Sequence, residues 1–238
     1  MPATKAKRVL LKLSGEALWD GKESISAESL KRTAQEIKSA VGASVVQLAI
    51  VIGAGNIWRG ADKFVERVTA DKMGMVATVI NALALNDVLK SAGLKSKVFS
   101  SYGVCGFVEN FNRDKVVGCL DKGYIVIFAG GTGNPYFTTD TTAALRAAEI
   151  NADILIKATQ VDGVYSADPK KDKKAVKFES LTFKEAIEKD LKIMDAEAFS
   201  LCMNSAVPIP IYVFDFYKDG NFRKVLNGEK IGTIISQK

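Results

Sequence analysis

The feature that most restricts the possible folds of this chain is a short apolar run that leads into glycine and occurs three times. The runs and their glycines are 8–14 with Gly15, 45–52 with Gly53, and 124–129 with Gly130. Apolar, β-branched runs of this length are typical of buried strands, and a helical pattern follows each glycine segment. Strands that alternate with helices predict an α/β protein with a mostly parallel central sheet covered by helices on both faces. In such folds ligands bind at the carboxyl ends of the strands, so we expect the three glycine segments to converge on one cleft.

The remaining sequence pattern extends this alternation along the whole chain, and we expect 1–238 to form a single domain. Further strands are predicted at 97–100, 153–158, 209–214 and 231–236, and helices at 26–41, 69–92, 112–121, 141–150 and 195–205. Ser26 is a suitable N-cap for the first helix, Gly93 ends the second, and Thr182 with Glu185 predicts a capping box for one more helix. The helix at 69–92 is apolar enough to predict burial on more than one side.

Composition excludes several classes of protein. The 238 residues are 47% hydrophobic and 25% charged, as in a soluble globular protein, and the net charge of +6 favours anionic partners. The three cysteines, Cys105, Cys119 and Cys202, are too far apart for a CxxC metal site and odd in number, so we expect free thiols. The absence of histidine excludes catalytic mechanisms that depend on imidazole.

No membrane segment or secretion signal is expected. Residues 39–58 carry no charge, but glycine and polar residues interrupt them and leave only 45–52 strongly apolar. Lys12 breaks the apolar run near the N-terminus, so that run does not resemble the core of a signal peptide. We therefore expect a cytoplasmic protein.

The segment Gly130–Asp140 (GGTGNPYFTTD) has the properties of a phosphate site. Glycines permit close backbone approach, and the helix that follows offers unpaired N–H groups and a favourable dipole to an anion. Thr138, Thr139 and Asp140 are candidate N-caps of that helix. An ordinary connection between a strand and a helix also explains a lone glycine cluster, but the polar residues around this one favour the site.

Two basic residues lie near the other predicted loops. Lys12 is near the carboxyl end of the first strand, and Arg59 follows the segment Gly53–Asn56. With the Gly131 loop they suit the stabilisation of a phosphoryl group in transfer. The chain has no GxxxxGK[ST] motif, which excludes a Walker-type NTPase. The lysine tract 170–174 lacks interleaved aromatic residues and is interpreted as a solvated loop, so nucleic acid is not an expected partner.

Five segments in this order resemble the bacterial uridylate (UMP) kinases of the amino acid kinase superfamily. They are Lys12–Leu18 (KLSGEAL), Gly53–Gly60, Asp71–Met75, Gly131–Asp140 and Lys157–Pro169. The resemblance implies a three-layer α/β/α sandwich that transfers the γ-phosphoryl group of Mg-ATP to UMP, giving UDP and ADP in pyrimidine nucleotide biosynthesis. It also implies a homohexamer built from dimers. The apolar residues 73–85 are a candidate dimer face, although burial in the core of one chain explains them equally well. Mg²⁺ is implied to be carried by ATP, with no protein metal ligand assigned.

The resemblance assigns a role to each matching residue. The catalytic residues are Lys12, Arg59 and Asp140. The residues at ATP are Lys12, Leu13, Ser14, Gly15, Gly55, Arg59, Thr159, Tyr165 and Asp168. The residues at UMP are Ala54, Asp71, Thr132, Gly133, Asn134, Pro135, Tyr136, Phe137, Thr138 and Thr139. Asp162 and Asp195 match acidic positions of the family without an assigned role.

The chain departs from the family pattern at several positions. Ala54 interrupts a triple glycine, Gln160 replaces a common lysine, and Glu66 replaces a common asparagine; the segment 19–25 lacks the glycine-flanked form that accompanies GTP activation in many relatives.

Other interpretations stay open at this point. Lys12 as an exposed lysine, Arg59 as an ion-pair partner and Asp140 as a helix cap each have a structural explanation. A kinase for a carboxylate or carbamate acceptor, a non-catalytic nucleotide-binding protein and a basic nucleic-acid-binding protein are alternatives at the level of function.

Overall fold

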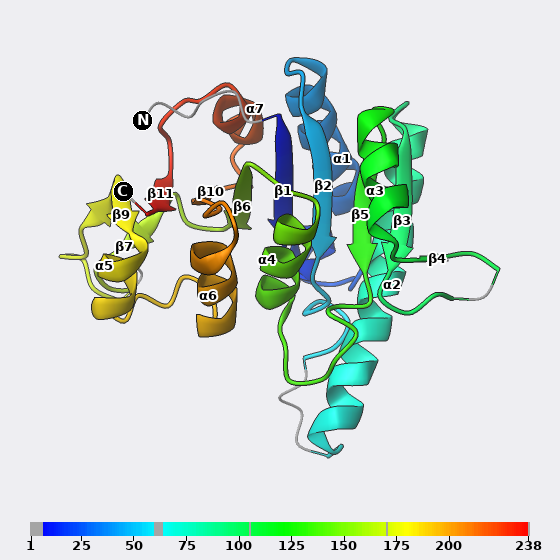
Figure 1. The fold of residues 1–238 in the computed structure, drawn as a ribbon, viewed down its shortest axis with the longest axis horizontal. Coiled ribbons are helices and arrows are strands. Elements are labelled where there is room, and N and C mark those ends of the chain that lie inside the picture. Colours follow the sequence, from blue (N-terminus) through cyan, green and yellow to red (C-terminus); the bar gives the residue numbers. More distant parts are fainter. Residues whose placement is uncertain (1–6, 60–63, 105, 170, 238) are drawn as a thin grey trace.

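The computed structural model describes residues 7–59, 64–104, 106–169 and 171–237. A nine-stranded sheet forms the centre of the molecule (Figure 1). Gly60, Cys105 and Lys170, which the sequence interpretation used, lie outside the described residues.

The sheet is parallel except at one edge. Across the sheet the strands are β4 (Glu109–Asn110), β3 (Ser96–Ser100), β5 (Ile125–Ala129), β2 (Gln47–Ile52), β1 (Arg8–Leu13), β6 (Ile154–Thr159), β10 (Ile211–Asp215), β11 (Thr233–Ser236) and β9 (Ser180–Thr182). Neighbouring strands run parallel to one another apart from the antiparallel pair β10 and β11. The predicted mostly parallel sheet is confirmed. In the order given above, the strands from β3 to β10 all have their carboxyl ends on the same side of the molecule.

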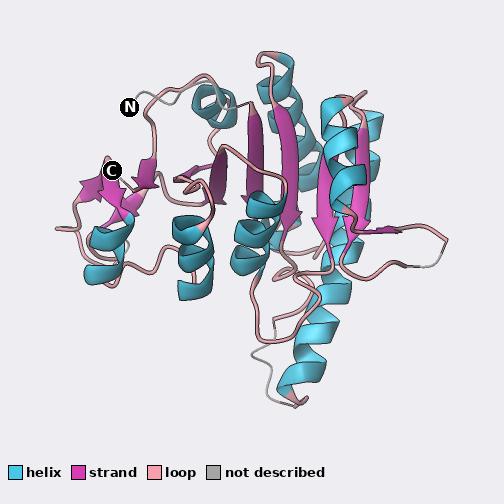
Figure 2. Ribbon diagram, in the orientation of Figure 1, coloured by secondary structure: helices cyan, strands magenta, loops and turns pink. Residues whose placement is uncertain are grey.

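Helices cover both faces of this sheet (Figure 2). One face packs against α1 (Ala27–Gly42), α2 (Arg67–Ser91) and α7 (Asn221–Leu226). The other packs against α3 (Arg113–Asp121), α4 (Thr139–Glu149), α5 (Phe183–Glu188) and α6 (Ala196–Asn204). A 3₁₀ helix, η1 (Gly15–Leu18), follows β1 directly. The result is the predicted three-layer α/β/α sandwich.

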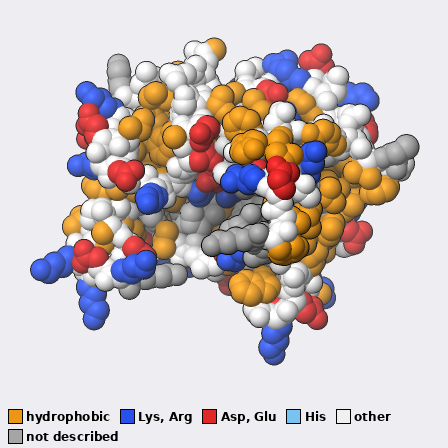
Figure 3. All heavy atoms as spheres, turned by 90° about the horizontal axis from the view of Figure 1, so that it is seen from below, with side chains coloured by type: hydrophobic (Ala, Val, Ile, Leu, Met, Phe, Trp, Pro, Cys, Tyr) orange, Lys and Arg blue, Asp and Glu red, His pale blue; other side chains and the backbone are white. Residues whose placement is uncertain are grey.

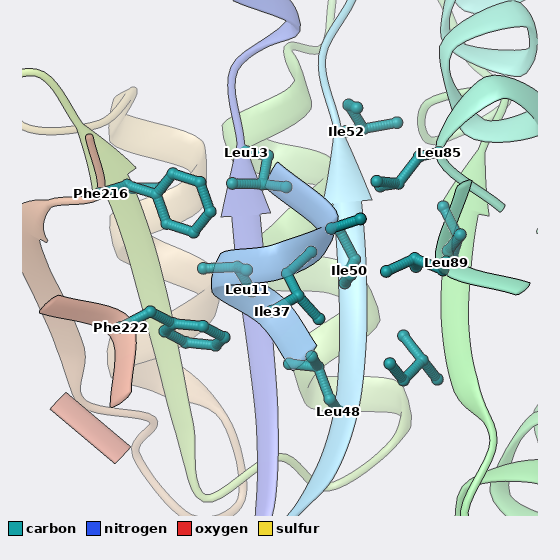
Figure 4. Packing of buried hydrophobic residues seen from close by; sticks show 14 of the residues in the cluster. Leu11, Leu13, Ile37, Leu48, Ile50, Ile52, Leu85, Leu89, Phe216 and Phe222 are labelled. Carbon is teal, nitrogen blue, oxygen red and sulfur yellow. The ribbon is translucent and has the colours of Figure 1, made fainter. Parts of the chain in front are cut away.

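The two-residue period of the strands divides the core into two halves. Leu11 and Leu13 of β1 face the layer of α1 and α2, where Leu11 lies near Ile37 (Figure 4). Leu10 belongs to the opposite half, with α4 and α6. Lys12 shares the parity of Leu10, so its side chain projects toward the α4 face.

Several local predictions are confirmed by hydrogen bonds and backbone angles. The Ser26 side chain accepts a hydrogen bond from the Ser29 N–H at the start of α1. Gly93 adopts a φ of +85° just past the end of α2, a conformation that side-chain-bearing residues rarely adopt. Thr182 and Glu185 form the capping box of α5.

The prediction that α2 is buried on more than one side is wrong. Leu85 and Leu89 pack against the sheet, but Val76 is 63% exposed and Ile80 46% exposed. No helix of the described chain covers this outer side. By length and composition α2 would be able to span a membrane, yet 44% of its most apolar window is buried inside the protein.

A small hairpin lies where only a loop was expected after β6. Strand β7 (Val164–Tyr165) pairs with β8 (Lys177–Phe178) in a separate antiparallel sheet. Strands of two residues are too short to show a periodic pattern in the sequence, which is why the hairpin was missed.

Candidate active site

Two lysines lie side by side near the carboxyl ends of the central strands. Lys12 of β1 and Lys157 of β6 are register partners across the parallel pair. Both follow the parity of Leu10 and Leu155, which belong to the core half on the α4 side. The alternation of the two strands therefore directs both ammonium groups to the place where α4 begins.

Asp140, in the first turn of α4, lies between these two lysines. Its Oδ1 is 2.6 Å from the Lys12 Nζ, and its Oδ2 accepts a hydrogen bond of 2.6 Å from the Lys157 Nζ. The three side chains are only 12–16% exposed. The Lys157 Nζ also donates to the carbonyl oxygen of Ile193. Lys12 is therefore not the exposed lysine of the alternative interpretation, and the cap of α4 is Thr138 rather than Asp140.

This cluster carries two positive charges and one negative charge. Burial disfavours ionisation of Asp140, but the adjacent Lys12 and Lys157 outweigh that effect and hold its pKa below the ordinary value. Burial lowers the pKa of Lys157, with the positive charge of Lys12 acting in the same direction and Asp140 opposing. The cluster is one anion short of neutrality, which suits it to receive an anionic group.

The first two glycine segments touch one another beside this cluster. A Cβ atom on Gly15 would lie 2.8 Å from the Gly53 carbonyl oxygen and 3.0 Å from the Gly55 nitrogen. A Cβ atom on Gly53 would lie 3.4 Å from the Thr139 Oγ1, at the start of α4. Such close backbone approach requires glycine at Gly15. The predicted convergence of the loops is confirmed.

A buried asparagine of α2 holds the second loop. The Asn81 side chain is fully buried, and its Nδ2 donates to the Gly53 carbonyl oxygen at 2.8 Å and to the Asn56 Oδ1 at 2.8 Å. Ala54 lies between these two anchored positions. It is buried and has no positive φ, so its methyl group causes no backbone strain.

An exposed ion pair forms one rim of the cleft. The Arg59 Nη2 lies 2.8 Å from the Glu16 Oε1, and the Arg59 Nε donates to the Gly55 carbonyl oxygen at 3.0 Å. The Gln160 Nε2 donates to the other Glu16 oxygen at 3.4 Å. Glu16 therefore connects the second glycine loop to the segment that follows β6. The interpretation of Arg59 as an ion-pair partner is correct for the structure without nucleotides.

Two predicted acceptor residues that are 65 positions apart contact one another. The Tyr136 N–H donates to the Asp71 Oδ2 at 2.7 Å. Tyr136 has a φ of +72°, which is unfavourable for a residue with a side chain. Arg67 binds the same Asp71 oxygen at 2.8 Å and lies over the Tyr136 ring. Asp71 and Arg67 thus stabilise the sharp turn of the third glycine segment.

A cavity of about 310 Å³ lies between α2 and this third segment. Six of the predicted substrate residues line it: Ala54, Gly55, Asp71, Phe137, Thr138 and Thr139. Viewed from the edge where the strands end, the surface is hollowed near its middle, with charged side chains around the hollow (Figure 3). The cavity has the size of a small organic ligand.

Asp195, which had no assigned role, joins two helix starts. Its Oδ2 accepts hydrogen bonds from the hydroxyl groups of Thr138 and Thr141, the latter at 3.0 Å. Its Oδ1 accepts from the Ala198 N–H at 2.8 Å as the N-cap of α6. Asp195 therefore fixes the beginning of α4, and with it Asp140.

The residues predicted for adenosine follow β6 directly. Thr159 ends that strand, and its hydroxyl group donates to the Val161 carbonyl oxygen at 2.7 Å. The Tyr165 hydroxyl group donates to the Asp162 Oδ1 at 2.6 Å, and the Lys177 Nζ lies 2.9 Å from the Asp162 Oδ2. Asp162 thus braces the β7–β8 hairpin. The carbonyl oxygen of the exposed Asp168 accepts from the N–H groups of two residues that follow it, Lys171 and Asp172.

The other predicted residues form the walls of these loops. The Leu13 carbonyl oxygen accepts from the Gly53 N–H at 2.9 Å, and the Ser14 Oγ accepts from the Glu16 N–H at 3.3 Å. In the third segment the Thr132 Oγ1 accepts from the Asn134 N–H at 3.1 Å. Gly133 and Pro135 flank Asn134 in this turn.

The sequence interpretation missed the role of Lys157. Its signal was a charged residue inside the otherwise apolar run 154–158, at the position that pairs with Lys12 once β1 and β6 are aligned. Asn81 and Arg67 were also missed, because only the fold brings them to the loops. Among the described residues, no group of three or more Asp, Glu, His or Cys side chains is suited to hold a metal ion.

Comparisons with known proteins agree with this geometry. A model of the amino acid kinase family matches residues 7–215. The structure is similar to that of a UMP kinase from Bacillus anthracis, with a TM-score of 0.94 and 39% identity over 98% of this chain and 97% of that one. It is also similar to a UMP kinase from Ureaplasma parvum (TM-score 0.91, 35% identity, 98% and 100% covered) and to a uridylate kinase from Archaeoglobus fulgidus (TM-score 0.70, 30% identity, 96% and 99% covered).

Proposed function

Since this chain belongs to the amino acid kinase family, we propose that it is a UMP kinase, which transfers the γ-phosphoryl group of ATP to UMP and releases UDP and ADP. The observation that carries the proposal is the buried cluster of Lys12, Asp140 and Lys157, where the glycine loops meet. The cluster is short of one negative charge, and the phosphates of two nucleotides supply anionic groups to it. Transfer then takes place between them.

The chemistry requires no histidine. A phosphate monoester has a second pKa near 6, so the attacking oxygen of UMP is largely ionised at neutral pH and needs no general base. The enzyme's task is to bring two anions together and to stabilise the charge on the transferring group. Lys12 and Lys157 do this as fixed ammonium groups in a largely buried site, and Asp140 holds both of them in position.

The proposed sites lie on two sides of this cluster. UMP occupies the cavity between α2 and the third glycine segment, with Asp71 and Thr132–Thr139 around it. ATP lies over Gly15 and Gly55 with its adenosine toward Thr159, Tyr165 and Asp168. Arg59 stands between the two sides and exchanges Glu16 for a phosphate when the nucleotides bind.

We propose that Mg²⁺ enters with ATP. Each carboxylate oxygen of Asp140 lies 2.6 Å from a lysine ammonium nitrogen, so this chain fits a metal held mainly by phosphate oxygens and water. When bound, the metal supplies further neutralisation of the phosphate charges.

An assay of acceptor specificity tests the proposed function. Purified protein is incubated with Mg-ATP and equal concentrations of UMP, CMP, dUMP, carbamate or acetylglutamate, and ADP formation is measured. We expect UMP to be phosphorylated much faster than the others. Faster turnover of another acceptor, or no transfer to any of them, would contradict the proposal.

The outer side of α2 supports a proposal about assembly in the cytoplasm. Val76, Ile80, Tyr102 and Phe107 are each 46–65% exposed around an apolar cavity of about 750 Å³, and hydrophobic side chains gather on this side in Figure 3. We propose that a second copy of the chain covers this face, and that dimers formed in this way build the homohexamer. Sedimentation velocity would then give six copies, whereas a monomer would contradict it.

A further inference from the structure

We propose that Arg146 is a positioning residue that holds the glycine loop Gly130–Gly133 in the shape that binds the acceptor nucleotide. The inference rests on the proposed function, since it concerns the affinity for the acceptor UMP.

Arg146 is buried at an unusual place for a charged side chain. It lies on α4, is only 4% exposed, and forms an ion pair with Glu149. Its guanidinium carbon lies 3.7 Å from the centre of the Phe111 ring. Burial of a charge is costly unless its hydrogen-bonding groups are satisfied, so these contacts fix the orientation of the guanidinium group.

A hydroxyl group connects this guanidinium to the loop. The Arg146 Nη2 donates to the Ser101 Oγ at 2.8 Å, and the Ser101 Oγ donates to the Gly131 carbonyl oxygen at 2.6 Å. A charged donor polarises the hydroxyl group and strengthens the bond that this group donates in turn. Arg146 therefore acts on the loop through Ser101.

The loop needs such external support. Gly130, Gly131 and Gly133 have φ values of +75°, +60° and +87°, and glycine loses more conformational freedom than any other residue when it is fixed. On the α2 side the Thr78 Oγ1 accepts from the Gly130 N–H at 2.8 Å. Ser101 holds the adjacent carbonyl group from the other side, so the loop is fixed at two successive residues.

The placement of Arg146 has a specific consequence. The same helix carries Asp140 in its first turn and Arg146 two turns later. Helix α4 therefore positions both the acceptor loop, through Arg146, and the charge cluster, through Asp140. Loss of the link releases the loop without displacing the groups proposed to bind ATP, and the effect should fall on UMP alone.

Two substitutions test this link. Ser101→Ala removes the connecting oxygen, and Arg146→Met removes the charge while keeping most of the volume. For each we expect the KM for UMP to rise about tenfold, the scale of one lost hydrogen bond, with the KM for ATP changed less than twofold. Glu149→Gln is the matched control, because it weakens the ion pair but leaves the link to Ser101 intact. Its UMP KM should stay within about threefold of the original.

The double variant separates this role from a purely structural one. If Arg146 acts through Ser101, the UMP KM of Ser101→Ala/Arg146→Met should equal that of Arg146→Met alone. Independent multiplication of the two effects, an equal rise in the KM for both nucleotides, or an unchanged UMP KM in Ser101→Ala would overturn the inference. Failure of the unsubstituted enzyme to phosphorylate UMP would instead overturn the proposed function.

Discussion

The centre and the rim of the cleft hold opposite charges in different ways. At the centre, Asp140 is 14% exposed and contacts two lysines that the register of β1 and β6 places beside it. At the rim, Glu16 is 34% exposed and Arg59 62% exposed. Buried charges interact strongly and cannot rearrange cheaply, whereas exposed pairs contribute little and are screened by salt. The centre is therefore built before substrate arrives, and the rim is free to exchange partners.

The largest expected effect comes from the centre. In Lys12→Ala the cluster loses a fixed charge that we propose stabilises the transferring phosphoryl group, and turnover should fall by about 10²-fold or more. Steady-state ADP formation at saturating nucleotides measures this. The exposed Lys31 of α1 provides a matched control, and Lys31→Ala should leave turnover unchanged. Undiminished turnover in Lys12→Ala would show that the buried cluster has no catalytic role.

The pH dependence of turnover tests whether the buried centre needs both lysines in their charged form. Burial and the charge of Lys12 lower the pKa of Lys157 from the ordinary 10.5, so the folded protein releases this proton while the unfolded chain still holds it. Since the unfolded state then binds more protons, this group makes folding more favourable as the pH rises toward 10.5. We expect turnover to fall about tenfold per pH unit above the lowered pKa, without unfolding.

Lys157→Arg tests the assignment of that decline. The guanidinium group keeps its charge at high pH, so the alkaline decline should move upward even if the maximal turnover is lower. Circular dichroism over the same pH range monitors the fold. A decline that stays in place in Lys157→Arg would assign it to another group.

The smallest effect is expected at the rim. Arg59→Ala should raise the KM for ATP by about tenfold or less, and this effect should shrink as salt increases, because the side chain is exposed. Glu16→Gln should lower that KM slightly, since it frees Arg59 from its partner. A loss of turnover in Arg59→Ala as large as that in Lys12→Ala would remove the distinction between centre and rim.

Much of this arrangement was predictable because it is local in the sequence. Apolar runs, caps and glycines predicted the sheet, most helix boundaries and the position of Lys12 near a strand end. Contacts such as the Tyr136 N–H to Asp71 depend instead on how distant segments are packed. The pairing of Lys157 with Lys12 depends on strand register, which no single segment encodes.

The uncovered side of α2 was mispredicted for a related reason. Hydrophobicity indicates that Val76 and Ile80 avoid water, but it does not distinguish burial within one chain from burial by a second. The roles of Ser101 and Arg146 were likewise invisible, because neither belongs to a glycine motif. The residues proposed to contact a nucleotide belong to sequence motifs, whereas the residues that hold the loop in place are recognised only from their contacts in the structure.

The register between β1 and β6 makes activity a test of correct folding. A slip of one residue would turn either Lys12 or Lys157 to the opposite face of the sheet and separate it from Asp140. If the slip is in β1, it would also exchange Leu10 with Leu11 and Leu13 between the two halves of the core and bury Lys12 without its partner. The specific activity recovered after refolding therefore counts only the molecules whose two central strands are correctly aligned.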